Sequence, residues 1–165
     1  MRVLFLGGTG NISTACVEHA LARGHQVGIL TRGQRPSPFG PWVEVLHGDR
    51  DDASALGKAA GGRWDAVVDF LAYRPEQLDL AVDAFAGKTG QYVFIGTVAT
   101  YDKPNAPLPF TEDAPLANPH WEYARLKIAC EERVRSASRE LPTTIVRPSY
   151  TYGPTWIPSG FGGQD

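Results

Sequence analysis

The sequence has few residues that could form a disulfide bond or bind a metal ion. Its only cysteines are Cys16 and Cys130, and neither lies in a CxxC motif or in a histidine-rich neighbourhood. Both fall inside helical patterns, so we expect two small core residues and no disulfide. The histidines show no spacing typical of metal ligands, and we predict no metal site from His19, His25, His47 and His120.

The sequence also lacks a large excess of charge of one sign, and it lacks long apolar runs. The chain carries 16 basic and 18 acidic residues, for a net charge of -2, without a basic run. Nucleic acid and anionic membranes are therefore not expected as partners. No apolar run approaches the ~20 residues of a membrane span, and the first residues lead into a strand and not into a signal peptide. We expect a cytoplasmic protein.

The sequence does contain alternating apolar runs and helical patterns, in a chain whose 165 residues are 42% hydrophobic, enough for one domain. The runs lack period-two alternation, which is typical of strands buried on both faces. They cover residues 2–6, 26–31, 42–47, 66–70, 91–96 and 143–147, and the helical patterns cover 12–23, 53–60, 75–86 and 121–139. This order predicts an α/β fold with a doubly wound parallel sheet of the Rossmann type.

Two segments depart from this alternation. Residues 101–120 contain five prolines and cannot hold a regular element, so they predict a long loop, and loops of that length are often functional. Residues 153–165 contain four glycines and two prolines. We expect a nucleotide-binding domain over residues 1–152 and, over 153–165, a truncated loop that would lead into a further domain.

A glycine-rich turn follows the first predicted strand. Gly7, Gly8 and Gly10 let the backbone reach positive φ and approach a pyrophosphate closely, and Ser13 stands where a third glycine is usual. The helix that begins near Asn11 directs its free N–H groups and positive dipole end at the same anion. The turn predicts a dinucleotide site, with contacts from Gly7, Gly10, Asn11 and Ile12. A glycine turn that serves only the fold is the alternative.

The ends of the next strands bear on the choice of cofactor. Thr31 and Arg32 stand where NAD-selective sites usually have a carboxylate. A guanidinium can pair with a 2′-phosphate, so we expect NADP to be preferred, with NAD as the alternative and a simply solvated Arg32 left open. Asp49, with Arg50 beside it, could accept from the adenine amino group or be an exposed turn residue. Further cofactor contacts are expected from Leu71 and Ala72, after the fourth strand.

Tyr123 and Lys127 lie four residues apart, on one face of the last predicted helix. An unperturbed phenol titrates near 10. An adjacent ammonium and a cationic nicotinamide both favour the phenolate, so the spacing suits proton transfer. Thr97 offers a hydroxyl at the end of the fifth strand, at the edge of the sheet where ligands of open α/β folds bind. Taken alone, the spacing of Tyr123 and Lys127 is also compatible with an exposed helix face.

These motifs, in this order, resemble the extended short-chain dehydrogenases/reductases of the NAD(P)-dependent epimerase/dehydratase family. The resemblance also includes Gly48-Asp49 and the run from Arg147-Pro148 to Tyr152-Gly153-Pro154. It implies that Thr97 polarises the substrate oxygen and that Tyr123 donates or accepts the proton. It further implies that Lys127 holds the nicotinamide ribose and lowers the tyrosine pKa, and that Pro148 borders the nicotinamide.

Departures from the family pattern limit the set of reactions that we expect of this chain. Dehydratases of this family usually have Asp-Glu after the hydroxyl residue, where this chain has Val98-Ala99, which leaves epimerisation or carbonyl/alcohol redox chemistry. Family members usually continue into a C-terminal substrate domain, and we expect this domain to be absent here, either because the chain is a fragment or truncated gene product or because another chain supplies the missing elements. We therefore weigh an enzyme acting on a small molecule, for instance a sugar nucleotide, against a non-catalytic NADP(H)-binding or redox-sensing module or an inactive fragment. A homodimer is an expectation of the resemblance alone.

Overall fold

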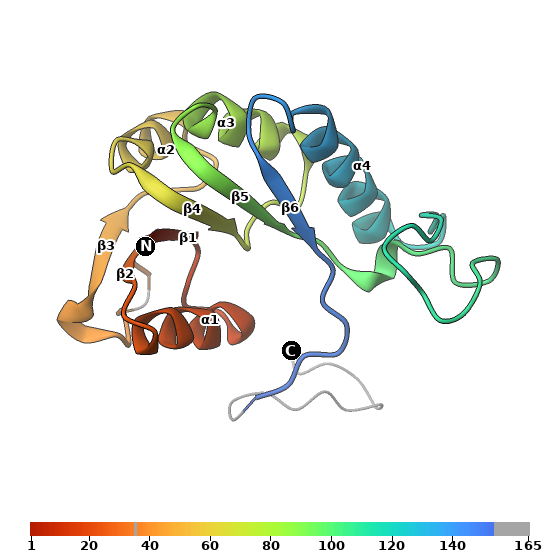
Figure 1. Cartoon of the computed structure of the whole chain (residues 1–165), viewed down its shortest axis with the longest axis horizontal. Coiled ribbons are helices and arrows are strands. Elements are labelled where there is room, and N and C mark those ends of the chain that lie inside the picture. The colour runs from red at the N-terminus through yellow and green to blue at the C-terminus, as the bar shows by residue number, and fades with distance from the viewer. Residues whose placement is uncertain (35, 154–165) are drawn as a thin grey trace.

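Six parallel strands form one sheet in the computed structural model, which describes residues 1–34 and 36–153. The strand order is β3-β2-β1-β4-β5-β6, and all neighbouring strands are parallel (Figure 1). The strands are β1 (Arg2–Leu6), β2 (Gln26–Thr31), β3 (Val43–His47), β4 (Trp64–Asp69), β5 (Thr89–Ile95) and β6 (Thr143–Val146). This order reverses between β1 and β4, as in the predicted doubly wound Rossmann-type fold, which is confirmed.

Helices connect the strands and form the outer layers. They are α1 (Asn11–Ala22), α2 (Ala53–Ala60), α3 (Pro75–Phe85) and α4 (Glu122–Ser136), with short 3₁₀ turns η1 (Gly40–Trp42) and η2 (Val98–Thr100). The predicted elements all exist, and their ends differ from the predicted ones by at most three residues. Helix α4 is three residues shorter at its C-terminal end than the predicted 121–139, and β4 and β5 each begin two residues early.

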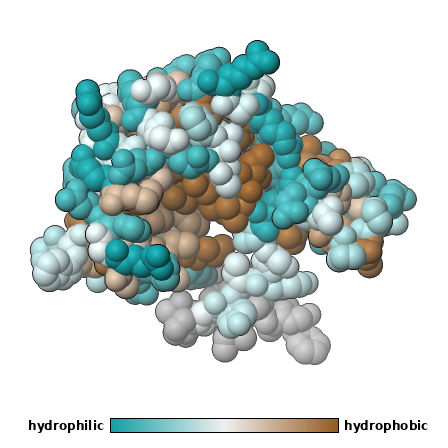
Figure 2. Space-filling view, in the orientation of Figure 1, coloured by the Kyte–Doolittle hydropathy of each residue, from teal (hydrophilic) through white to brown (hydrophobic). Residues whose placement is uncertain are grey.

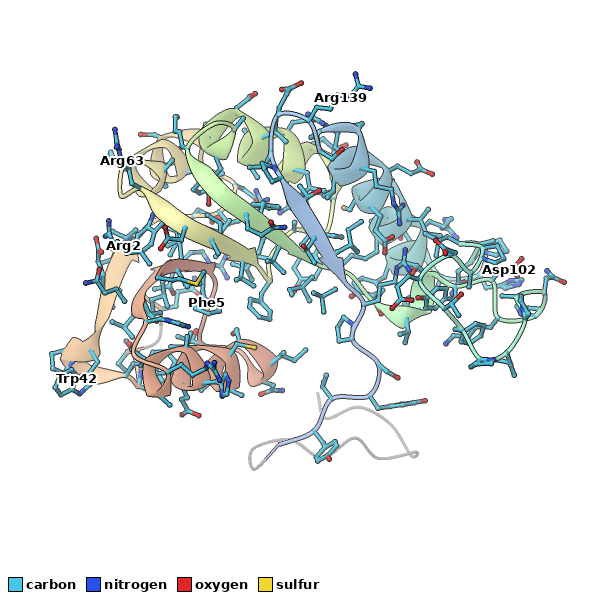
Figure 3. All side chains as sticks on the ribbon, viewed as in Figure 1. Arg2, Phe5, Trp42, Arg63, Asp102 and Arg139 are labelled. Atoms are coloured by element: carbon cyan, nitrogen blue, oxygen red, sulfur yellow. The ribbon has the colours of Figure 1, made fainter. Side chains whose placement is uncertain are left out.

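The sheet buries side chains on both faces. Helices α2, α3 and α4 cover one face and α1 covers part of the other (Figure 1). Leu4 and Leu6 of β1 belong to the core beneath α2, α3 and α4. Val3 and Phe5, at the alternate positions, belong to the core beneath α1 (Figure 3). Burial on both faces explains why the strands have no period-two pattern.

The α1 side of the sheet is only partly covered within the described residues. Helix α1 packs on β1 and β2, and Figure 2 shows apolar surface in the hollow between α1 and the rest of the sheet. Val146 of the edge strand β6 is 42% exposed. No helix among residues 1–34 and 36–153 has the length and apolar character that a membrane span requires.

The loop predicted over residues 101–120 is irregular but packed. Tyr101 pairs with Leu116 in an isolated antiparallel bridge, and the rings of Tyr101 and Phe110 stack at 5.1 Å between centroids. Arg147, just after β6, donates to the Tyr101 hydroxyl at 2.9 Å and to the Glu112 carbonyl at 3.1 Å. These contacts attach the loop to the end of β6. The segment expected over residues 153–165 lies, apart from Gly153, outside the described residues.

Candidate active site

A cavity of about 820 Å³ opens at the carboxyl ends of the parallel strands. Its wall is formed by the glycine turn after β1, the ends of β2 to β5, helix α4 and the segment after β6. Among the residues expected to act here, the cavity is lined by Gly7, Gly10, Asn11, Ile12, Thr31, Arg32, Asp49, Arg50, Leu71, Thr97, Tyr123, Lys127 and Pro148. The fold therefore gathers these residues, which are spread over more than 140 positions of the sequence, at one site.

The glycine turn has the predicted conformation at two of its three glycines. Gly7 and Gly8 have φ of 105° and 114°, and a Cβ on Gly8 would lie 2.7 Å from a methyl carbon of Ile29. The prediction is wrong for Gly10, whose φ of -90° is extended because this residue is the N-cap of α1. Ser13 is buried, and its Oγ accepts from the Gly10 N–H at 2.9 Å. The serine that replaces the third glycine thus closes the first turn of the helix.

Arg32 and Asp49 border the end of the cavity at β2 and β3. Both side chains are exposed, as expected for groups that would contact a ligand or solvent. Asp49 Oδ1 accepts from the Asp51 N–H at 3.0 Å, which shapes the turn after β3. Thr31 is partly buried at the end of β2 and also lines the cavity.

Arg50 does not extend beside Asp49 as the sequence suggested. Its side chain is only 3% exposed and forms an ion pair with the fully buried Asp69 at 2.7 Å. The hydroxyl of Tyr92 donates to the same Asp69 oxygen at 2.6 Å. Asp69 and Tyr92 were not among the predicted site residues. A signal existed, because an aspartate at the end of an apolar strand needs a buried partner.

Ala72 is a second departure from the expected contacts. It is fully buried and does not line the cavity, although the neighbouring Leu71 does. Its backbone N–H donates to Asp69 at 3.0 Å, and its carbonyl accepts from Lys127 Nζ at 2.7 Å. Ala72 therefore lies behind the cavity wall and supports Lys127.

Lys127 is 2% exposed and its ammonium is fixed by backbone carbonyls. Nζ donates to Ala72 and to Ile95, in both cases at 2.7 Å. It also lies 4.7 Å from the ring centroid of Phe94 and 4.8 Å from that of Tyr73. Burial lowers the pKa of Lys127 to about 8. An ammonium has three donors, so one remains beyond the two carbonyl bonds.

Tyr123 is partly buried, one turn before Lys127. Burial raises the pKa of its phenol, with a further increase from Tyr73, while a hydrogen bond with the Thr97 side chain lowers it. This differs from the expectation that the neighbouring ammonium favours the phenolate. Lys127 Nζ lies 5.8 Å from the Tyr123 ring centroid, and two of its three proton donors bond to the carbonyls of Ala72 and Ile95. The phenol is therefore protonated at neutral pH.

Thr97 and Pro148 complete this end of the cavity. Thr97 is the N-cap of η2, and its hydroxyl oxygen accepts from the Ala99 N–H at 3.2 Å. The hydroxyl proton remains available to a ligand or to Tyr123. The Pro148 carbonyl accepts from the Val98 N–H at 3.2 Å, which joins the segment after β6 to the segment after β5.

Aromatic rings flank the Tyr123 side chain. The ring of Trp121 lies 4.8 Å and that of Tyr73 lies 6.3 Å from the Tyr123 ring, measured between centroids. Tyr73 lines the cavity and is 45% exposed. Tyr73 was not predicted as a site residue, because it lies fifty positions away in an irregular segment.

The chain is similar in sequence to known proteins. Residues 3–164 match the model of the NAD dependent epimerase/dehydratase family. The chain is 32% identical over 138 residues to 2'-dehydrokanamycin reductase of Streptomyces kanamyceticus, with 83% of this chain and 38% of the relative covered. It is 30% identical over 153 residues to UDP-glucose 4-epimerase of Lactobacillus helveticus, with 80% and 46% covered.

Two further matches are a relative whose name gives a different role and a solved structure with bound NAD. The chain is 26% identical over 167 residues to the chloroplast stem-loop binding protein of 41 kDa b of Arabidopsis thaliana, with 93% of this chain and 43% of that protein covered. A short-chain dehydrogenase/reductase superfamily protein of Agrobacterium tumefaciens, solved with bound NAD, matches with a TM-score of 0.70 and 27% identity over 89% of this chain and 48% of its own. The chain thus spans less than half the length of each of these four proteins.

Proposed function

Because the chain belongs to the NAD dependent epimerase/dehydratase family, we propose that it is an oxidoreductase or epimerase that binds a nicotinamide dinucleotide, preferably NADP, in the cavity. Its substrate is a carbonyl or an alcohol of a small molecule. One observation carries the proposal: the side chains of Thr97, Tyr123 and Lys127 line the same cavity as the glycine turn. This is the edge of the sheet where open α/β folds bind ligands.

The cavity offers groups that fit each part of such a cofactor. The N–H groups at the start of α1 and the backbone of Gly7 and Gly8 suit a pyrophosphate. Arg32, exposed at the end of β2, suits a 2′-phosphate. Asp49 suits the adenine amino group. Lys127, Thr97 and Pro148 lie at the other end, where the nicotinamide riboside would be held.

The residues of this chain would handle the proton. When bound, the nicotinamide supplies hydride exchange with a substrate carbon. Tyr123 is protonated at neutral pH, so it is ready to donate to a carbonyl oxygen that becomes an alcohol. The Thr97 hydroxyl, whose oxygen accepts from the Ala99 N–H, would direct its single proton to the same oxygen and polarise it. The third proton of the Lys127 ammonium would bind a ribose hydroxyl while its other two remain on Ala72 and Ile95.

The substrate class follows from the relatives and from one departure in sequence. One relative is named for UDP-glucose and another is named a reductase, which supports a sugar nucleotide or a related carbonyl compound as substrate. Val98 and Ala99 follow Thr97, so no carboxylic acid stands there to assist removal of water. This favours epimerisation or redox chemistry over dehydration.

Two measurements on the 165-residue chain test the proposal. Calorimetric titrations with NADP and with NAD should both show binding, with the smaller Kd for NADP. Reduction of added carbonyl compounds, including 4-keto nucleotide sugars, is then followed by loss of NADPH absorbance. Binding without turnover would favour a non-catalytic NADP(H)-binding module. Absence of binding to either cofactor would overturn the proposal.

A further inference from the structure

Asp69 accepts hydrogen bonds from four donors in the interior of the protein. Its Oδ1 accepts from the N–H groups of Leu71 at 2.8 Å and Ala72 at 3.0 Å. Its Oδ2 accepts from Arg50 Nη2 at 2.7 Å and from the Tyr92 hydroxyl at 2.6 Å. The residue is 0% exposed. Four donors from three segments leave this carboxylate a single orientation, and that orientation fixes the turn after β4.

The same turn holds Lys127. Ala72 donates its N–H to Asp69, and its carbonyl accepts from Lys127 Nζ at 2.7 Å. A change in the turn would therefore move one of the two carbonyls that hold the ammonium. The other carbonyl belongs to Ile95, at the end of β5, the strand that also carries Tyr92.

Arg50 stabilises the negative charge of Asp69, although two of its own donor groups remain without a hydrogen bond. Its Nε and Nη1 are buried without a hydrogen-bond partner among the described residues. If Arg50 served only to fill space, an apolar side chain could take its place without loss of stability. A charged partner for Asp69 is what this arginine provides.

We propose that Asp69, paired with Arg50, is a positioning residue: its bonds to the turn at Leu71 and Ala72 set the place of the Lys127 ammonium, and its negative charge favours the charged form of that ammonium. Asp69 does not line the cavity, so it acts on the site through Ala72 and through its charge. The proposal rests on the role given to Lys127 under the proposed function. It adds that a buried carboxylate at the end of β4 contributes to the position and the protonation of the lysine that would hold the nicotinamide ribose.

The protonation of Lys127 can be measured without cofactor or substrate. The chain has four lysines, and the other three, Lys58, Lys88 and Lys103, are exposed. In a sample labelled with 13C-lysine, the Cε resonance that titrates at a lower pH than the others is that of Lys127, with its midpoint near pH 8. The Lys127→Met variant, which lacks this signal, confirms the assignment.

Several charged or titratable groups influence Lys127 besides Asp69. Asp69 and Glu131 raise its pKa, and Arg50 lowers it. The rings of Tyr73 and Tyr123 also lie within 6 Å of Nζ. The pKa of Cys130 is raised to about 11, so its thiol stays protonated through the lysine midpoint.

The Asp69→Asn variant removes the charge and keeps an oxygen for the turn. We expect the Lys127 midpoint to fall by roughly half a pH unit or more. In two matched control variants, the midpoint of the Lys127 titration should not change. Tyr92→Phe removes one bond to Asp69 but keeps its charge and its bonds to the turn. Asp79→Asn removes a half-exposed carboxylate on α3 that pairs with Arg133. No shift in Asp69→Asn, or an equal shift in Tyr92→Phe, would overturn the proposal.

Asp69→Asn leaves Arg50 buried without a charged partner and could fail to fold. The comparison is then made in a background without that charge: Arg50→Gln alone against Arg50→Gln with Asp69→Asn. The midpoint should again be lower in the variant that lacks Asp69, and equal midpoints would contradict the proposal. Because the titration requires no cofactor, its failure is distinct from a failure of cofactor binding or turnover.

Discussion

Arg147 and Glu131 form a bidentate ion pair between the end of β6 and helix α4. Nε and Nη2 of the arginine donate to the two carboxylate oxygens at 2.9 and 2.7 Å, and Glu131 is fully buried. The hydrogen bonds to Glu131 raise the pKa of Arg147, which remains charged throughout the accessible pH range. The pair therefore attaches the segment carrying Pro148 to the helix carrying Tyr123 and Lys127.

Replacement of Arg147 by methionine should destabilise the protein strongly. Glu131 would keep only its bond from the half-exposed Arg135. An uncompensated buried carboxylate lowers the free energy of unfolding by roughly 3–5 kcal/mol. Urea denaturation measures the loss. Arg139→Met, at an exposed position beyond α4, should change stability by no more than about 0.5 kcal/mol, and equal effects of the two variants would contradict the assignment.

Tyr123→Phe should abolish most of the turnover proposed for this site. The variant removes the proton donor, and the expected loss in the rate of NADPH oxidation is about 100-fold or more. Binding of cofactor should be nearly unchanged, as measured by calorimetry. Tyr150→Phe is the matched control, since Tyr150 is 88% exposed and does not line the cavity. Unchanged turnover in Tyr123→Phe would remove this tyrosine from the proposed mechanism.

Arg32→Gln should change the preference between cofactors. If the guanidinium binds the 2′-phosphate, its loss weakens NADP by roughly 1.5–3 kcal/mol, or tenfold or more in Kd. The affinity for NAD, which lacks that phosphate, should stay within about a factor of two of the wild type. Parallel calorimetric titrations give both values. Arg63→Gln, distant from the cavity, controls for the loss of one positive charge.

Gly8 and Gly10 should respond differently to substitution by alanine. At Gly8, φ is 114° and the new Cβ would lie 2.7 Å from Ile29, so Gly8→Ala should destabilise the protein by about 2 kcal/mol or more. At Gly10, φ is -90° and the new Cβ would meet only Ser13 Oγ, at 3.3 Å, so the loss should be smaller. The urea midpoints of the two variants decide the order.

Lys127 should give the stability a pH dependence that a neutral residue lacks. Its pKa is about 8 in the folded protein against an ordinary 10.5, so the unfolded chain binds more protons between these values. The free energy of unfolding contributed by this group therefore rises with pH, by up to about 1.4 kcal/mol per unit. The difference in unfolding free energy between wild type and Lys127→Met, measured from pH 7 to pH 10, should be flat below pH 8 and rise above it.

The elements of the fold could be predicted from sequence because each leaves a local pattern. The apolar runs, the helical patterns and the prolines of residues 101–120 all act within a few positions. The inward turn of Arg50, the carbonyl partners of Lys127 and the contact of Tyr73 with Tyr123 left no such pattern. Those contacts join residues 19 to 55 positions apart. Their geometry depends on how the strands are ordered in the sheet.

The phosphate-binding turn is followed by a helix, yet its position in the sheet depends on a distant strand. β1 pairs with β4 in the register Val3 to Ala66, more than sixty residues along the chain. Such non-local pairing requires a long loop to close before the contacts between the strands can form. Residues 1 to 60 supply β1, β2 and β3, but the cavity also needs Thr97, Tyr123 and Lys127 from later in the chain. A nascent or partly folded chain should therefore have no affinity for the cofactor, and a bound cofactor should draw the last folding step to completion.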